Sequence, residues 1–224
     1  VVDVDRHVRP ILKKVGVPAI VFCCSLPLME DKVLNVQKIH LMIGKVGFAQ
    51  FRNEFYAAAE NLRSDLDAEK EDITHLGLRG SHRFDRKEVG DFKRMLNFEF
   101  KYATLDHILE VMFAHHFGDE KDVVRRLYLT LDDLRRCQDD GIEIGLHTHS
   151  HRVLSRLNKE QQGQEIGLCA DFFAHHLGIS DLHLAYPYGV NGTGNQNIFA
   201  VLTQKGLRRG PPLPHTPNMP PQVG

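Results

Sequence analysis

The sequence has no tryptophan, few cysteines and no long apolar segment, and the last two shortages each exclude a class of protein. Four cysteines, two of them adjacent at Cys23 and Cys24, are too few and too scattered for a disulfide framework, so free buried thiols are expected. No apolar run reaches the roughly 18 residues of a membrane-spanning helix. No signal peptide is recognisable either. We therefore predict a cytoplasmic protein without a membrane span.

An excess of charge of one sign is also missing. The 28 Lys and Arg residues nearly balance 29 Asp and Glu residues, giving a formal net charge of −1, and no basic block stands out. Nucleic acid and anionic membranes are therefore poor partners, and a neutral or small substrate is favoured. The 224 residues, 42% of them hydrophobic, suffice for one large α/β core, so a second domain is not required.

The first half of the chain predicts a helix, a strand and then a long helical stretch. The segment from His7 to Lys14, ended by Gly16, is expected as a helix, and the segment from Val17 to Cys24 as a buried strand. Apolar residues keep a helical spacing from Asp31 to about Leu129, with a loop expected from Thr74 to Val89. Such a helical stretch between two strands could cap a groove and select the substrate; the alternative is that it only packs outside the strands or makes a dimer contact.

The second half begins with a helix that leads into the most informative strand. Thr130 is expected to cap a helix that ends near Gly141. Asp132 and Asp133 lie in its first turn, where carboxylates are favourable with the helix dipole, so they are interpreted as dipole partners. The alternating apolar residues at 142–146 then predict a short strand.

A further helix and strand complete a parallel unit. Asn158 is expected to cap a helix that runs to about Leu177, and the segment from Leu182 to Tyr186 is expected as the next strand. Strand, helix and strand in this order indicate a parallel βαβ unit. The carboxyl ends of its strands, where such folds carry their chemistry, would lie at one edge of the sheet.

Three histidines follow the strand at 142–146 directly, in the run His147-Thr-His-Ser-His151. One turn of chain can bring His147 and His151 together, and two imidazoles at this spacing can hold a metal ion. His149, two residues from each, is expected to point away from them. With 14 histidines in the chain such a spacing can arise by chance, so purely structural histidines stay an alternative.

Two other histidine pairs have a simpler explanation. Both pairs close a predicted helix just before a glycine, where a cation is favourable at the negative end of the helix dipole. They are therefore interpreted as helix-capping groups: His115 and His116 before Gly118, and His175 and His176 before Gly178.

Two motifs resemble one family. The segment from Glu143 to His151, followed by Leu154-Ser-Arg-Leu157, resembles the H-[ST]-x-x-H metal-binding motif of the polysaccharide deacetylases, the NodB-homology family of carbohydrate esterases (family 4-like). Leu184-Ala-Tyr-Pro-Tyr-Gly189 resembles that family's next motif, a Pro-aromatic-Gly turn in the wall of the active-site groove. The resemblance implies an α/β fold, a distorted (β/α) barrel. It would be one catalytic domain at 1–210 with a helical insertion at about 31–129, followed by a proline-rich tail at 211–224.

The resemblance also implies a chemistry. The protein would be a metal-dependent hydrolase that removes acetyl groups from an acetylated carbohydrate; N-acetyl groups are favoured, and O-acetyl esters stay an alternative that the sequence does not separate from them. His147 and His151 would hold a divalent metal, with Zn²⁺ favoured. The backbone N–H of Tyr188 would stabilise the oxyanion, and Tyr186, Pro187 and Tyr188 would line the substrate site.

Parts of the family pattern have no counterpart. The family's Asp-Asp-Gly, which supplies the general base and a third metal ligand, would lie just before Val1, so we expect the sequence to be a fragment of a longer enzyme. Asp3 and Asp5 are not expected to replace it. Ala185 stands where many members have an arginine, and no Leu-x-His is found, because His215 lies in the extended tail.

Three interpretations therefore stay open. The first is a metal-dependent deacetylase. The second is a catalytically incomplete, carbohydrate-binding or regulatory member of the same fold, and the third is an α/β domain with structural histidines. Metal content separates the third from the other two.

Overall fold

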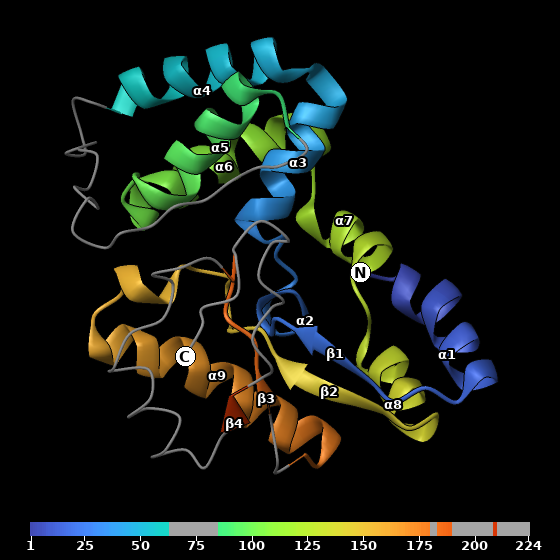
Figure 1. The fold of residues 1–224 in the computed structure, drawn as a ribbon. Helices are drawn as coiled ribbons and strands as arrows, with labels where there is room; N and C mark the ends of the chain where they lie inside the picture. Colours follow the sequence, from blue (N-terminus) through green and yellow to red (C-terminus); the bar gives the residue numbers. More distant parts are fainter. Residues whose placement is uncertain (63–84, 180–182, 190–207, 210–224) are drawn as a thin grey trace, which may run out of the picture.

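A small parallel sheet with its helices lies beside a separate group of helices (Figure 1). The computed structural model describes residues 1–62, 85–179, 183–189 and 208–209. The strands pair in the order β1-β2-β3-β4, all in parallel. They are β1 (Ala19–Cys23), β2 (Ile142–Leu146), β3 (His183–Leu184) and β4 (Arg208–Arg209). The α/β class is thereby confirmed. Within the described residues the pairing does not return from β4 to β1, and the closed barrel stays a prediction.

The N-terminal helix begins earlier than expected. A π-helical turn, η1 (Val4–Val8), continues as α1 (Arg9–Val15), and Gly16 ends it with a φ of 70°. The strand β1 follows, paired with β2 along its whole length. All five of its side chains are only partly buried, so the expectation of a fully buried strand was wrong. The reason is that β1 lies at the edge of the described sheet, with a paired strand on one side alone.

The helix α8 (Leu131–Asp139) begins as the sequence predicts. The N–H of Asp133 donates to Thr130 Oγ1 at 3.1 Å, and the N–H of Thr130 donates to Asp133 Oδ2 at 2.7 Å. These reciprocal bonds form a capping box, which satisfies two backbone donors at the helix start. Gly141, with a φ of 77°, then turns the chain into β2.

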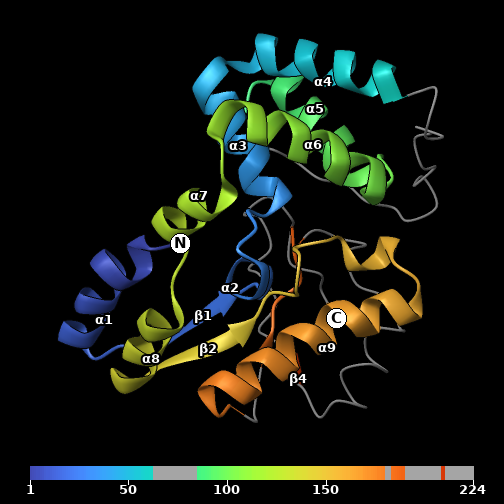
Figure 2. The ribbon, with the colours of Figure 1, turned by 180° about the vertical axis from the view of Figure 1, so that it is seen from behind.

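The helix α9 (Lys159–Leu177) covers one face of the sheet (Figure 2). Asn158 and Gln161 form its capping box, and Gly178 ends it in the left-handed conformation, so both predicted boundaries are confirmed. A short 3₁₀ turn, η3 (Leu154–Arg156), lies between the histidines and α9. The next strand is shorter than expected, with β3 limited to His183–Leu184.

The predicted helical stretch is observed as a series of helices between β1 and α8. Its expected loop at 74–89 falls mostly outside the described residues, but its end is helical because α5 already begins at Lys87. No helix in the described ranges has the length and apolarity needed to cross a membrane. The helices are α2 (Leu26–Glu30), α3 (Asn35–Val46), α4 (Phe48–Leu62), α5 (Lys87–Phe98), α6 (Tyr102–Phe117) and α7 (Glu120–Leu127).

The buried apolar side chains form two separate cores. The sheet core joins β2 and β3 to α8 and α9, and includes Ile144, Leu146 and Phe173. The insertion core lies among α3 to α7, where Phe92 packs edge-on against Phe55 with ring centroids 5.7 Å apart. The insertion is therefore a packed unit of its own and not an extended flap.

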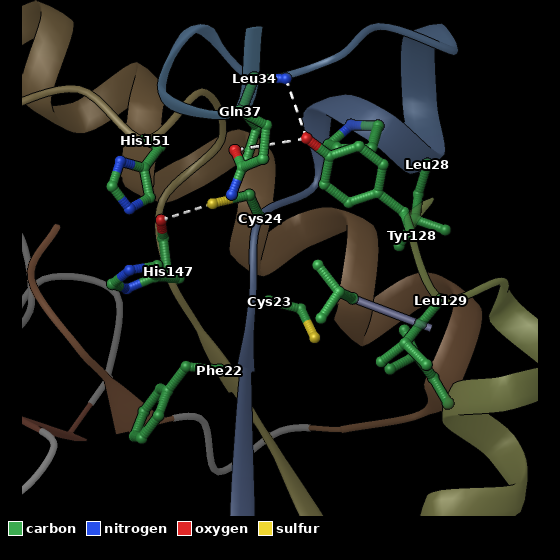
Figure 3. A pocket seen from close by; sticks show the side chains of 13 residues that line it. Phe22, Cys23, Cys24, Leu28, Leu34, Gln37, Tyr128, Leu129, His147 and His151 are labelled. Atoms are coloured by element: carbon green, nitrogen blue, oxygen red, sulfur yellow. Dashed lines mark hydrogen bonds between the residues drawn. The ribbon is translucent and has the colours of Figure 1, made fainter. Parts of the chain in front are cut away.

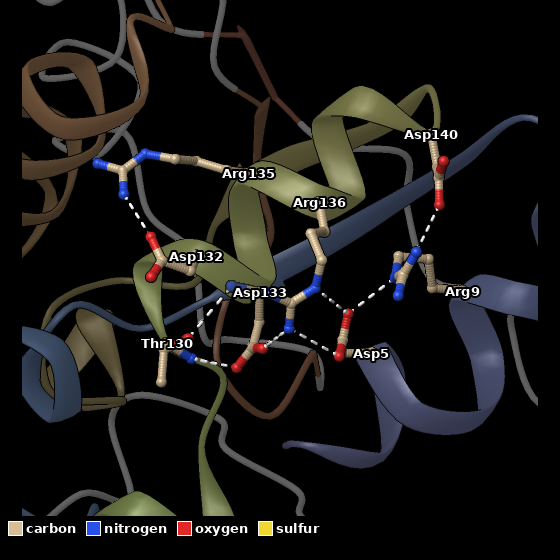
Figure 4. A network of polar contacts seen from close by, with 8 residues as sticks. All are labelled: Asp5, Arg9, Thr130, Asp132, Asp133, Arg135, Arg136 and Asp140. Atoms are coloured by element: carbon tan, nitrogen blue, oxygen red, sulfur yellow. Dashed lines mark hydrogen bonds and ion pairs between the residues drawn. The ribbon is translucent and has the colours of Figure 1, made fainter.

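Charged side chains fasten the N-terminal helix to α8 (Figure 4). Asp5 accepts from Arg9 Nε at 2.7 Å and from Arg136 Nη2 at 3.0 Å. Asp140 accepts from Arg9 Nη1 and pairs with Lys13 Nζ, both at 2.6 Å. The bond from Arg136 lowers the pKa of Asp5, and the bonds from Lys13 and Arg9 lower the pKa of Asp140.

Candidate metal centre

The first histidine is held at the end of β2 by backbone groups. The N–H of His147 donates to the carbonyl oxygen of Cys23 at 2.9 Å, which extends the ladder between β1 and β2. Its side-chain Nδ1 lies 2.9 Å from the carbonyl oxygen of Ala185, at the end of β3. A carbonyl oxygen only accepts, so Nδ1 carries the proton and Nε2 keeps its lone pair. The imidazole is therefore in the tautomer that can bind a metal ion through Nε2.

The chain then makes a tight turn that returns to the first histidine. Thr148 has a φ of 65° and His151 a φ of 63°, values that cost roughly 1–3 kcal/mol each for residues other than glycine. The N–H of His151 donates to Thr148 Oγ1 at 3.1 Å and closes the turn. The ring centroids of His147 and His151 are 4.8 Å apart. The expected approach of the two imidazoles is thus observed.

The two rings are partly buried and neutral. Burial lowers the pKa of His151 to about 3, and the neighbouring His147 adds to this. Burial also lowers the pKa of His147, with the Ala185 carbonyl acting in the opposite direction. Metal ions bind neutral imidazole. In addition, the buried Nδ1 atom of His151 has no hydrogen-bond partner among the described residues, which is unusual for a buried polar atom and fits a metal-binding nitrogen.

The described residues supply two candidate metal ligands and no third. Within these ranges no group of three or more His, Cys, Asp or Glu side chains is placed to hold one ion. Cys24 is nearby, but its Sγ donates to the carbonyl oxygen of His147 at 3.0 Å, and burial raises the pKa of its thiol. Asp3 is exposed, and Asp5 belongs to the ionic network with Arg9 and Arg136. The expectation that neither aspartate completes the site agrees with these positions.

The middle histidine points away from the pair, as expected, but into the protein. His149 is 7% exposed. Its Nδ1 lies 2.8 Å from Ser25 Oγ and its Nε2 lies 3.2 Å from Glu30 Oε1. Its carbonyl oxygen accepts from the N–H of Leu26 at 3.0 Å. His149 therefore fastens the turn to the start of α2.

The aromatic turn after β3 forms a second wall beside the histidines. Tyr188 has a φ of 67°, and its ring centroid lies 5.0 Å from that of His151. The same ring packs against Phe98 of α5, with the centroids also 5.0 Å apart. Tyr186 is partly buried and Pro187 is buried in the same turn. The structure therefore brings together the two motifs that the sequence singled out, together with one residue of the insertion.

The insertion is bonded to the segment that follows the histidines. The N–H of Val153 donates to the Tyr102 hydroxyl at 2.9 Å, and the Arg156 guanidinium lies 4.4 Å from the centroid of the same ring. Arg156 also donates to the carbonyl oxygens of Asn97 and Phe100. The ends of α5 and α6 are thus placed next to the candidate site.

A cavity of about 240 Å³ opens beside the two imidazoles (Figure 3). Part of its wall comes from the insertion, through Leu34, Gln37 and Tyr128. The Tyr128 hydroxyl accepts from the N–H of Leu34 at 3.0 Å and donates to Gln37 Oε1 at 3.4 Å. Sequence reasoning missed these residues, because a helical spacing does not show which helix face meets a site a hundred residues away. Strand β1 and the segments around it complete the wall with Val1, Phe22, Cys23, Cys24, Pro27, Leu28, Leu129 and Leu134.

Comparisons with known proteins bear on the same region. Residues 110–210 match the family model for polysaccharide deacetylase, and this range contains both histidines and the aromatic turn. This region therefore resembles a polysaccharide deacetylase domain. Among solved structures, the chain matches the Streptococcus pyogenes deacetylase PplD, determined in complex with acetate, at 22% identity and a TM-score of 0.32. The match covers 34% of this chain and 33% of that one, so this chain spans about a third of that structure. No curated protein sequence matches it.

Proposed function

We propose that the chain is part of a metal-dependent hydrolase that removes acetyl groups from an acetylated carbohydrate, N-acetyl groups rather than O-acetyl esters. The observation that carries the proposal is the pair His147 and His151. The ring centroids of these two neutral, partly buried imidazoles lie 4.8 Å apart at the end of a parallel strand. The deacetylase family match over residues 110–210 supports the same activity.

The donor set favours Zn²⁺. Imidazole nitrogen suits zinc, and catalytic zinc sites combine protein ligands with an open position. His147 and His151 would hold the ion, which when bound lowers the pKa of a water molecule toward 7 and polarises the acetyl carbonyl. The described residues around the pair include no counterpart of the family's third ligand or general base.

The aromatic turn would bind the reacting group. The backbone N–H of Tyr188 would donate to the acetyl oxygen as negative charge develops on it, a contribution that needs no particular side chain. Tyr186, Pro187 and the ring of Tyr188 would form the wall against which the sugar packs. The contact of Tyr188 with His151 supports this arrangement, because the turn lies directly beside one of the two proposed metal ligands.

The insertion would shape the substrate groove. Of the two alternatives, capping a groove is favoured over packing outside the sheet, because Leu34 and Gln37 line the cavity beside the histidines. Phe98, another residue of the insertion, packs against Tyr188. We propose that these insertion residues select the sugar.

Metal analysis after dialysis tests the proposal. We expect about one Zn²⁺ per chain, lost in the double variant His147→Ala, His151→Ala. The matched control is His175→Ala, His176→Ala, which removes an adjacent exposed pair from the last turn of α9 and is expected to keep the ion. Equal zinc content in the two double variants would exclude the proposed site and favour structural histidines.

A second candidate is a catalytically incomplete member of the fold that binds carbohydrate. The observation that favours it is that only two ligands are found in the described residues. The zinc-loaded chain should be incubated with an N-acetylated oligosaccharide, and both acetate release and binding should be measured. Acetate release that depends on His147 supports the hydrolase. Binding without acetate release supports the incomplete member.

A further inference from the structure

Glu165 is a buried carboxylate whose contacts are with the histidine loop, defined here as residues 147–151. It lies on α9 and is 8% exposed. Its Oε2 accepts from the N–H of Ser150 at 2.8 Å, and its Oε1 accepts from the Ser150 hydroxyl. Its backbone carbonyl oxygen accepts from the N–H of His149 at 2.9 Å. Glu165 thus engages two consecutive amides between the two candidate metal ligands.

The loop needs such an anchor. Thr148 and His151 hold left-handed backbone conformations at its two sides, which these residues do not adopt readily without support. Glu165 holds the two residues between Thr148 and His151, because it accepts hydrogen bonds from His149 and Ser150. Without these bonds the backbone is expected to relax to ordinary φ values, and the 4.8 Å approach of the two imidazoles would be lost.

We propose that Glu165 is a positioning residue that presets the spacing of His147 and His151 for a metal ion. The proposal rests on the proposed function only in that the two histidines bind metal. Glu165 itself would not touch the ion or the substrate. Outer contacts of this kind typically change metal affinity by about 10- to 100-fold when they are removed.

The test is the Zn²⁺ affinity of Glu165→Ala and Glu165→Gln, measured by competition with a chromophoric chelator. We expect Glu165→Ala to bind Zn²⁺ about 10- to 100-fold more weakly than the unmodified chain. Glu165→Gln should recover most of the loss. Its amide oxygen can accept from the N–H of Ser150, while its amide N–H can donate to the Ser150 hydroxyl.

A neighbouring residue supplies the matched control. Gln162 is fully buried on the same helix, and its Nε2 donates to the carbonyl oxygens of Leu154 and Leu157, both at 2.9 Å. Gln162→Ala removes two hydrogen bonds to chain outside the histidine loop. It is expected to lower Tm and to leave the Zn²⁺ affinity of the folded protein unchanged. If Glu165→Ala weakens Zn²⁺ binding no more than Gln162→Ala does, the positioning role is refuted.

Two further measurements keep the outcome decisive. If Glu165→Ala does not fold, Ser150→Ala removes only the hydroxyl contact, and an unchanged Zn²⁺ affinity would then overturn the proposal. If the unmodified chain binds no Zn²⁺, the proposed function fails by itself. Hydrogen exchange then decides the positioning role: the amide of Ser150, which donates to the Glu165 side chain, should exchange faster in Glu165→Ala than in Gln162→Ala, and equal rates would refute it.

Discussion

The imidazole of His147 donates from Nδ1 to the carbonyl oxygen of Ala185, 2.9 Å away, and so joins the ends of β2 and β3. The partner is a backbone atom, so the ring is oriented whatever side chain stands at position 185. Many members of the family that the chain resembles have an arginine at this position. The alanine found here does not affect the hydrogen bond that orients His147, because the acceptor is a backbone oxygen. The two ring nitrogens thus have different roles: Nδ1 makes the structural hydrogen bond, and Nε2 is the nitrogen proposed to bind the metal ion.

Two substitutions of His147 should separate these nitrogens. His147→Asn places an amide N–H near the position of Nδ1, so the bond to Ala185 is kept while the metal-binding nitrogen is lost. We expect stability close to that of the unmodified chain and no bound Zn²⁺. His147→Gln does not reproduce the Nδ1 donor and should also cost about 1 kcal/mol of unfolding free energy. Urea unfolding and metal analysis measure both, and retained zinc in His147→Asn would contradict the assignment.

Acid should weaken the attachment of the N-terminal helix to α8. The pKa values of Asp5 and Asp140 are lowered from their ordinary value of 3.8 by their Arg and Lys partners. A carboxyl group with a lowered pKa in the folded state stabilises the protein above its unfolded pKa, and this contribution is lost as the pH falls through the folded pKa. We therefore expect Tm to fall below about pH 4. The fall should be smaller in the double variant Asp5→Asn, Asp140→Asn.

The control for the acid effect is Asp132→Asn. Asp132 pairs with Arg135 on the surface of α8, with its side chain 78% exposed. Exposed ion pairs contribute little to stability, so this variant should keep the acid dependence of the unmodified chain. Tm measured by circular dichroism from pH 2 to pH 7 compares the three proteins. Parallel curves for all of them would show that the network does not govern acid stability.

Gly145 in β2 is required by the aromatic ring beside it. A Cβ atom at this position would lie 2.6 Å from Cδ1 and Cε1 of Phe22, on the neighbouring strand. Gly145→Ala should therefore force the ring to move, at a cost of about 1–3 kcal/mol in the free energy of unfolding. Gly163→Ala in α9 is the matched control, because its added Cβ meets open space and a helical glycine costs roughly 0.5–1 kcal/mol relative to alanine. In a denaturant titration, the free energy of unfolding should therefore fall for Gly145→Ala and rise for Gly163→Ala.

The hydroxyl of Tyr102 links the insertion to the chain after the histidines. Tyr102→Phe keeps the ring under the Arg156 guanidinium but leaves the N–H of Val153, a fully buried residue, without its partner. Leaving a buried donor unsatisfied costs about 1–3 kcal/mol. Tyr56→Phe serves for comparison, because the one hydrogen-bond contact of its hydroxyl within the described residues is with Met95 Sδ, at 3.9 Å. A loss of stability in Tyr56→Phe equal to that in Tyr102→Phe would show that the link contributes nothing specific.

The sequence predicted those features that depend on local rules. The caps at Thr130 and Asn158 follow from side chains that bond to the next backbone amides, and both are observed. The approach of His147 and His151 follows from their spacing after a strand. Their role as metal ligands stays a prediction, as does the role of Tyr188.

The remaining features depend on contacts between distant segments. Nothing in the spacing around Glu165 indicates that its carboxylate turns inward to Ser150. Nor does helical periodicity reveal that Gln37 lines the cavity beside His151. The partial exposure of β1 was missed because an apolar strand looks the same in sequence whether one or two strands pair with it.

The two separate hydrophobic cores suggest how selectivity and chemistry can be altered independently. A helical unit with its own interior can open locally, with a free energy distinct from that of the sheet. The cavity wall formed by Leu34 and Gln37 belongs to the helical unit, whereas both histidines follow the sheet. Substitutions among the phenylalanines around Phe92 are therefore expected to change how long a ligand stays in the cavity. The affinity for the proposed metal ion is expected to stay unchanged.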